Sequence, residues 1–337
     1  MRLEHSTLRR RFIAVAVALV ALGAILFLLW HRYGPRAITV TEGKFPEELV
    51  YVRAKDDIVN GGVMFTPPKA STKPIAVIWI HGWGTNFYYP TYVMIGRALA
   101  ARGYTTIIAN TRMHDLGNVA GERRGKRIRG GGYWGVESEE VRDLAAWIDF
   151  AEDQGFKKVV LVGHSAGWAA VRAYQAEKQD QRVAGVVLAS GAVRAETRPT
   201  DPQQLAEANR MMAAGRPDDL VRIPNRPFPS FISAATFLDI VNTPPEFKDF
   251  FGVQTRNPGV TRIHCPLLAF FGTREGNVGS EADLKLMKSS IQRQPSGPSR
   301  VDTFMIQNAD HMYTGEETQV AQTIAQWADS LLVAGSH

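Results

Sequence analysis

The chain has 337 residues, a formal net charge of +6 and a single cysteine, Cys265. This length allows one large or two modest domains, and an apolar fraction of 45% is normal for a globular protein with a core. A single cysteine excludes an intrachain disulfide and a cysteine metal cluster. The basic excess is too small to indicate nucleic-acid binding by itself, so we expect no nucleic-acid partner.

The N-terminus has the pattern of a membrane anchor. Residues 1–11 form a basic tail with four arginines, and residues 12–30 contain no charged residue. A helix over 12–30 would span roughly 28 Å, close to the hydrocarbon thickness of a bilayer. We therefore expect an uncleaved signal anchor there and a polar linker over 31–47. The arginine tail favours a cytoplasmic N-terminus, which would place the rest of the chain outside the cytoplasm. A signal peptide cleaved near residues 21–23 is the alternative, but apolar residues continue beyond that point.

Residues 48–335 predict one domain in which strands and helices alternate. Residues 49–53 and 62–66 have the pattern of a hairpin. Beyond them, continuous apolar runs predict buried strands, and helical periodicity predicts the helices between them. The expected strands are 75–80, 104–109, 159–162, 183–189, 266–271 and 301–306, and the expected helices are 92–101, 139–151, 169–177, 281–291 and 317–332. Ser138 is the expected N-cap of its helix. The alternation predicts an α/β fold with a mostly parallel, doubly wound sheet.

Two segments interrupt this alternation. Residues 110–135 predict a glycine-rich loop that carries five cations within 122–129. That basic stretch has two interpretations: a solvated loop, or a surface that attracts an anionic substrate or anionic lipid headgroups. Residues 194–261 contain helix-like pieces and prolines but no clear strand signal, so they predict a helical cap inserted into the domain. The pieces are 202–214, 231–241 and 246–251.

The stretch 159–168 carries the main chemical signal. Four apolar residues lead into Gly163-His164-Ser165-Ala166-Gly167, and a helical pattern follows. A serine at a sharp strand-to-helix turn takes a strained backbone conformation, and only residues without bulky side chains leave room on either side. Such a turn exposes the Ser165 hydroxyl as a nucleophile and directs the Ala166 amide at a developing oxyanion. A serine in an ordinary tight turn is the alternative.

A nucleophilic serine needs a base, and the base needs an acid to orient it. In enzymes with this turn the chain order is serine, acid, histidine. His311 fits as the base because it follows Ser165 and lies between the last expected strand and the last expected helix. Glu275 fits as the acid because it follows an apolar strand directly. Asp310 and Asp283 are weaker, since one is adjacent to His311 and the other lies inside a helix.

A second donor to the oxyanion is expected from His81-Gly82-Trp83-Gly84, which also follows a strand. Its glycines allow backbone amides to turn toward the site. The Trp83 N–H is the first choice to pair with the Ala166 N–H, and Gly84 is the second choice. A glycine turn with a packed tryptophan is the structural alternative.

Together these motifs resemble the α/β-hydrolase fold superfamily, over roughly residues 48–332. The resemblance implies a serine hydrolase that cleaves an ester, thioester or amide through an acyl-enzyme, with Ser165, His311 and Glu275 as its triad. A fainter similarity, in residues 110–112 and 146–150, is to the fungal siderophore-esterase group, and no substrate follows from it.

The expected partner is a small-molecule or lipid-like acyl substrate. The sequence has no dinucleotide fingerprint, P-loop or His-Glu-x-x-His motif, so no cofactor and no metal are expected. Two alternatives remain open. One is a binding protein that kept the fold without catalysis, and the other is haloperoxidase-like or lyase-like use of the same triad. The sequence predicts neither the substrate nor the oligomeric state.

Overall fold

The computed structural model describes residues 15, 17, 19–25, 27–28, 44–123, 125–194, 200–223, 231–275 and 278–334. The chain forms two units, Met1–Glu42 and Gly43–His337. In the first unit, the described residues between 15 and 28 are helical. Within the described part of the chain, no helix is both long and apolar enough to cross a bilayer. The predicted anchor, residues 12–30, lies partly outside the described residues and stays a prediction.

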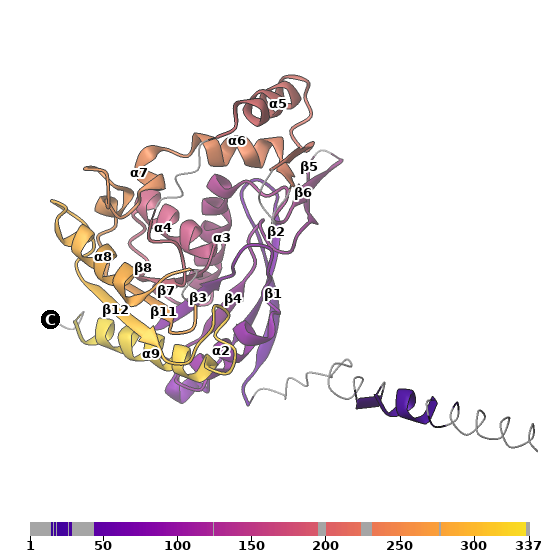
Figure 1. Cartoon of the computed structure of the whole chain (residues 1–337). Helices are drawn as coiled ribbons and strands as arrows, with labels where there is room; N and C mark the ends of the chain where they lie inside the picture. Colours follow the sequence, from indigo (N-terminus) through magenta and orange to yellow (C-terminus); the bar gives the residue numbers. More distant parts are fainter. Residues whose placement is uncertain are drawn as a thin grey trace, which may run out of the picture. The chain divides into compact units, whose positions relative to one another are not determined.

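A large mixed sheet organises the second unit (Figure 1). Its strands are β1 (Glu47–Arg53), β2 (Val59–Phe65), β3 (Ile75–Ile80), β4 (Thr106–Ala109), β7 (Lys158–His164), β8 (Val183–Ala189), β11 (Leu267–Gly272) and β12 (Val301–Ile306). They lie in the order β1-β2-β4-β3-β7-β8-β11-β12. The pairs β1–β2 and β2–β4 are antiparallel and the other neighbouring pairs are parallel. The predicted mostly parallel sheet is confirmed.

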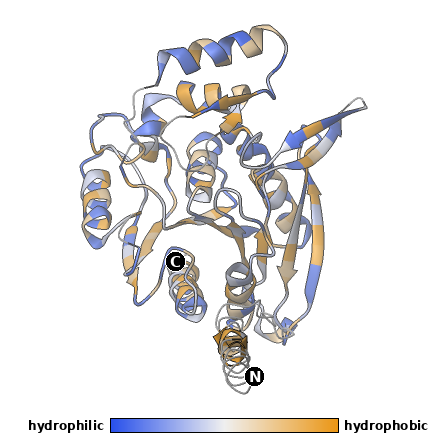
Figure 2. Ribbon diagram, turned by 45° about the vertical axis from the view of Figure 1, so that its right-hand side comes forward, coloured by the Kyte–Doolittle hydropathy of each residue, from blue (hydrophilic) through white to orange (hydrophobic). Residues whose placement is uncertain are grey.

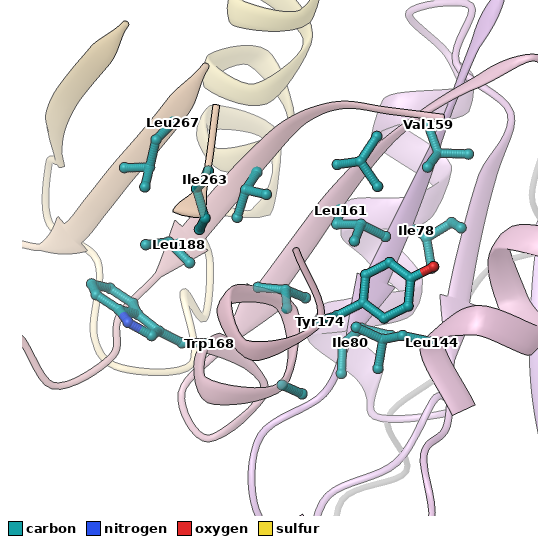
Figure 3. Close-up of a cluster of buried hydrophobic side chains, with 14 of the residues drawn as sticks. Ile78, Ile80, Leu144, Val159, Leu161, Trp168, Tyr174, Leu188, Ile263 and Leu267 are labelled. Carbon is teal, nitrogen blue, oxygen red and sulfur yellow. The ribbon is translucent and has the colours of Figure 1, made fainter. Parts of the chain in front are cut away.

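Helices cover both faces of this sheet because its central strands are apolar on both sides. Along β3, Ile78 and Ile80 pack on one face, whereas Val77 and Trp79 pack on the other. The first face is covered by α3 (Glu140–Asp153), α4 (Gly167–Lys178) and α8 (Glu281–Gln292), and the second by α2 (Pro90–Ala100) and α9 (Glu317–Ala334). Figure 3 shows side chains of the first core, from sheet and helices, pointing toward one another.

The segment predicted as a loop over residues 110–135 contains a hairpin, so that prediction is wrong in part. Strand β5 (Asn118–Arg123) pairs antiparallel with β6 (Lys126–Gly130). Its stability comes from tertiary contacts that glycine and charge content do not reveal. Ala120 packs against Ile58, and Gly121 approaches the turn before β2 so closely that a Cβ would lie 2.4 Å from the Asp57 carbonyl oxygen.

The start of α3 also differs from the prediction. A 3-10 turn, η2 (Glu137–Glu139), precedes the helix, and Glu139 occupies the N-cap position. Ser138 therefore lies inside that turn, where its hydroxyl donates to Asp239 Oδ1 at 2.5 Å. Ser138 does not cap α3; it joins the start of α3 to α6 (Ala234–Asn242).

The remaining elements lie between β8 and β11 in the chain. They are α5 (Pro202–Ala213), β9 (Leu220–Arg222), β10 (Phe231–Ser233), α6, α7 (Pro245–Lys248) and η3 (Gly259–Arg262). The paired strands β9 and β10 were not predicted, because three residues are too few to show a period. Ala208, Val221, Ile232 and Phe237 form a small core of their own. Figure 1 shows α5 and α6 stacked at the top of the second unit, and Figure 2 shows α5 to be mostly hydrophilic.

Candidate active site

Ser165 lies at the turn between β7 and α4, with a φ of 53° that non-glycine residues rarely adopt. The glycines on either side of it are required by space. A Cβ on Gly163 would lie 2.3 Å from the Gly167 carbonyl oxygen, and a Cβ on Gly167 would lie 2.5 Å from the His81 carbonyl oxygen. Both positions therefore exclude any larger residue, and the turn holds Ser165 in a strained conformation at the end of the sheet.

The carboxyl ends of three parallel strands bring Ser165, Glu275 and His311 together. Ser165 follows β7, Glu275 follows β11 and His311 follows β12, and these ends meet at one edge of the sheet. His311 Nε2 lies 3.0 Å from Ser165 Oγ, and His311 Nδ1 lies 2.8 Å from Glu275 Oε2. The three residues selected from chain order are thus in hydrogen-bond contact in the fold.

The second oxygen of Glu275 is held by groups that the sequence did not indicate. Glu275 Oε1 accepts hydrogen bonds from the Gly272 N–H and the Ser190 hydroxyl, and the Ser190 hydroxyl also contacts the Tyr313 hydroxyl. Burial raises the pKa of Tyr313 well above its usual value, so this hydroxyl stays neutral. Ser190 directly follows β8, and that position at a strand end was the available signal.

Asp310 and Asp283, the two weaker candidates for the acid, form hydrogen bonds to other groups. Asp310 Oδ1 accepts the backbone N–H groups of Met312 and Thr314, each at 3.0 Å, and so stabilises the turn after His311. Asp283 accepts the hydroxyl of Ser280 in the first turn of α8. Neither carboxylate contacts His311 in the described structure.

The model of the alpha/beta hydrolase fold family matches residues 75–250, more than half of the 337 residues. This chain belongs to the α/β-hydrolase fold family. The resemblance inferred from the motifs is thereby confirmed.

Solved structures share this fold at low identity. Est1E from Butyrivibrio proteoclasticus, with ferulic acid bound, is 16% identical with a TM-score of 0.59, and the match covers 84% of this chain and 99% of that chain. The Pyrococcus furiosus esterase Pf2001 is 15% identical with a TM-score of 0.53, covering 88% and 98%. DcsB, in complex with its substrate analogue, is 12% identical with a TM-score of 0.60, covering 85% and 99%. No curated protein sequence matches this chain.

In this α/β-hydrolase, a buried chain of hydrogen bonds joins Gly82 to His311. The Gly82 N–H donates to the Tyr92 hydroxyl at 3.2 Å, and Tyr92 Oη lies 2.7 Å from His164 Nδ1. His164 Nε2 lies 2.7 Å from the His311 carbonyl oxygen. Burial lowers the pKa of His164 to about 3, so the ring is neutral and carries one N–H. That N–H must be on Nε2 to serve the carbonyl, which leaves Nδ1 to accept from Tyr92.

His164 and Tyr92 therefore position the backbone of His311 from behind the site. Burial raises the pKa of Tyr92 to about 12, so its hydroxyl remains a donor at neutral pH. His164 precedes Ser165, so the chain order of serine, acid and histidine does not select it as the base. Its place inside the Gly-x-Ser-x-Gly motif was the signal that could have marked it as a neighbour of the site.

The loop after β3 is fixed by His81. Its Nδ1 lies 2.7 Å from the Gly82 carbonyl oxygen, and its Nε2 accepts the Thr111 N–H at 3.1 Å. Burial lowers the pKa of His81 to about 4, so it is neutral. The loop reaches Ser165 directly, because a Cβ on Gly82 would lie 3.0 Å from Ser165 Cβ.

Of the two residues predicted as oxyanion donors, Trp83 lies in this loop and Ala166 lies at the turn after β7. Trp83 and Ala166 line the same cavity of about 150 Å³, and Ala166 is the N-cap of α4. The Trp83 indole makes a separate hydrogen bond, in which its Nε1 donates to the Gly132 carbonyl oxygen at 3.1 Å. Trp83 is therefore held by the segment after β6.

A second cavity, of about 290 Å³, contains Ser165 and His311. Arg172, which no motif or strand end marks in the sequence, lines this cavity and a third one of about 210 Å³ that residues of α6 and α7 also line. Ala169 borders all three, so they surround the first turns of α4. Among the described residues no cluster of histidine, cysteine and carboxylate groups is arranged to hold a metal ion.

Proposed function

We propose that this α/β-hydrolase is a serine hydrolase that cleaves carboxylic ester bonds through an acyl-enzyme. The observation that carries the proposal is the contact series from Ser165 Oγ to His311 Nε2 at 3.0 Å and from His311 Nδ1 to Glu275 Oε2 at 2.8 Å. The fold supports it, because Est1E binds ferulic acid and Pf2001 is an esterase. Both ring nitrogens of His164 and of His81 are held by other groups, whereas His311 Nε2 contacts Ser165 Oγ and can take its proton.

In the proposed reaction, His311 Nε2 takes the proton of the Ser165 hydroxyl as Oγ attacks the ester carbonyl carbon. Glu275 accepts a hydrogen bond from the Nδ1–H of His311 and stabilises the imidazolium that forms. The imidazolium then gives its proton to the departing alcohol, and an ester of Ser165 remains. A water molecule, deprotonated by His311, releases the acid and restores Ser165.

The negative charge that develops on the carbonyl oxygen needs donors that already face it. We assign this role to the N–H groups of Ala166, at the N-cap of α4, and Trp83, which border one cavity next to Ser165. The cap, which we assign to residues 194–261, borders the neighbouring cavity through Asp239 and Phe247. We propose that this segment determines which acyl or alcohol groups fit.

A fluorophosphonate probe tests the reaction class. We expect the wild type and the matched control Ser138→Ala to be labelled, and Ser165→Ala not to be labelled. Ester turnover should fall by about 10⁴-fold or more in Ser165→Ala and His311→Ala, and by less in Glu275→Gln, because triad members act as a unit. An unlabelled wild type without ester turnover would indicate a binding protein.

We also propose that residues 12–30 anchor the protein, with the catalytic domain outside the cytoplasm. The proposal rests on the run of uncharged, mostly apolar residues over 12–30 behind an arginine-rich tail. A reporter fused to the C-terminus should be active outside the cytoplasm. A cytoplasmic reporter signal, or a mature N-terminus near Ala24, would contradict the anchor.

A further inference from the structure

Arg172 lies on α4, about two helical turns beyond Ser165. It lines the cavity that also contains Ser165 and His311. Helical side chains slant toward the N-terminus of their helix, which for α4 is the Ser165 end. A permanent positive charge therefore borders the space in which the substrate of the proposed reaction would lie.

This charge has no ion-pair partner within the described residues. The Arg172 guanidinium makes one hydrogen bond there, to the Phe247 carbonyl oxygen at 3.3 Å, and its central carbon lies 4.7 Å from the centre of the Phe250 ring. The negative charge of Glu137 acts on Arg172 and raises its pKa, which opposes the effect of burial. The side chain of Arg172 is partly buried, and this burial lowers its pKa to about 10.

The surroundings of Arg172 on the Ser165 side favour an anion. The described lining of this cavity is otherwise small, apolar or hydroxyl-bearing and includes no carboxylate: Ala166, Trp168, Ala169, Ser190, Ala192 and Val278. The carboxylates near Arg172 border the neighbouring cavities and not this one: Glu137, Glu140, Glu177 and Asp239. Burial raises the pKa of Glu140 to about 8, so it is mostly neutral at neutral pH. Among the described residues only the Phe247 carbonyl oxygen accepts from the guanidinium, which leaves most of its N–H donors for a ligand.

We propose that Arg172 binds a carboxylate of the substrate, so that this enzyme prefers esters carrying a carboxylate in the part of the substrate that reaches Arg172. A planar guanidinium pairs with a carboxylate through two parallel hydrogen bonds, and such a pair is favourable where water is excluded. The proposal rests on the function proposed above. It adds the substrate class: anionic esters, with the carboxylate in either the acyl or the alcohol part.

Matched pairs of esters test the preference. In the first pair, para-nitrophenyl hydrogen suberate carries the carboxylate in the acyl part, and para-nitrophenyl octanoate is its neutral counterpart. In the second pair, ω-acetoxyhexanoate carries it in the alcohol part, and hexyl acetate is neutral. The quantity compared is kcat/KM for the anionic ester divided by kcat/KM for the neutral one.

In at least one pair, this ratio should fall by about 10- to 100-fold in Arg172→Gln, since a hydrogen-bonded charge pair is lost. Arg172→Lys should retain part of the preference, which keeps the test valid if the glutamine variant folds poorly against Phe250. Arg210→Gln is the control, because it removes the same charge from an exposed position on α5. An unchanged ratio in both pairs for Arg172→Gln and Arg172→Lys would overturn the proposal.

Binding without turnover separates this inference from the proposed reaction. Suberate is titrated into Ser165→Ala and into Ser165→Ala with Arg172→Gln by calorimetry. We expect about 10-fold or greater loss of affinity in the double variant. Equal affinities would refute carboxylate binding by Arg172 even if esters are hydrolysed. If the wild type hydrolyses no ester but the double variant still binds suberate more weakly than Ser165→Ala, only the proposed reaction is refuted.

Discussion

Tyr92 offers the sharpest test of how the fold positions His311. Tyr92→Phe deletes one hydroxyl that serves two buried groups, the Gly82 N–H at 3.2 Å and His164 Nδ1 at 2.7 Å. Each buried polar group left without a partner costs about 1–3 kcal/mol, so the free energy of unfolding should fall by roughly 2–6 kcal/mol. Because His164 holds the His311 carbonyl, kcat should also fall, by about 10- to 100-fold, with a smaller change in KM.

The matched control is Tyr89→Phe. Tyr89 packs against Tyr92 with ring centres 5.5 Å apart, and its hydroxyl makes no hydrogen bond within the described residues. Urea unfolding gives the stability of both variants, and ester hydrolysis gives kcat and KM. If Tyr92→Phe matches Tyr89→Phe in stability and in kcat, then the chain from Gly82 to His311 does not position the histidine.

Three further predictions concern the turn, a buried carboxyl and the basic hairpin. Gly163→Ala should cost about 3 kcal/mol or more and abolish activity, because its Cβ would lie 2.3 Å from the Gly167 carbonyl oxygen; calorimetry would show an unchanged Tm if this is wrong. Burial raises the pKa of Glu140 to about 8 from an ordinary 4.5, so above about pH 4.5 the folded state keeps a proton that the unfolded state loses. The stability that this carboxyl contributes is therefore fully present below about pH 4.5 and is lost as the pH rises through 8. In unfolding experiments, the free energy of unfolding of Glu140→Gln relative to the wild type should therefore rise by a few kcal/mol between pH 5 and about 8. A difference that does not change with pH would contradict the burial argument. Replacing the exposed Lys126 and Arg127 by serine should leave turnover of a neutral soluble ester unchanged; weaker binding to anionic vesicles at low salt would show that β5–β6 contacts lipid.

Local sequence was sufficient for the parallel sheet and for the three residues at its edge. Apolar runs identify buried strands because both faces of such a strand are covered, as β3 shows with Ile78 on one core and Trp79 on the other. Chain order and strand ends then select Glu275 and His311, since the carboxyl ends of parallel strands meet at one edge. The α/β-hydrolase fold was predictable for the same reason.

Only the tertiary structure decided the contacts between residues that are distant in sequence and individually ordinary. The hairpin β5–β6 depends on close approach to the Asp57 backbone, and the role of His164 depends on Tyr92 and on the His311 carbonyl. Arg172 stands out only when burial and the lack of an ion pair in the described structure are known. None of these features has a period or a motif, because each arises from the packing of several elements. The sequence by itself therefore determined the scaffold and the three residues of the candidate site, whereas packing determined how they are held and which charge borders the cavity beside Ser165.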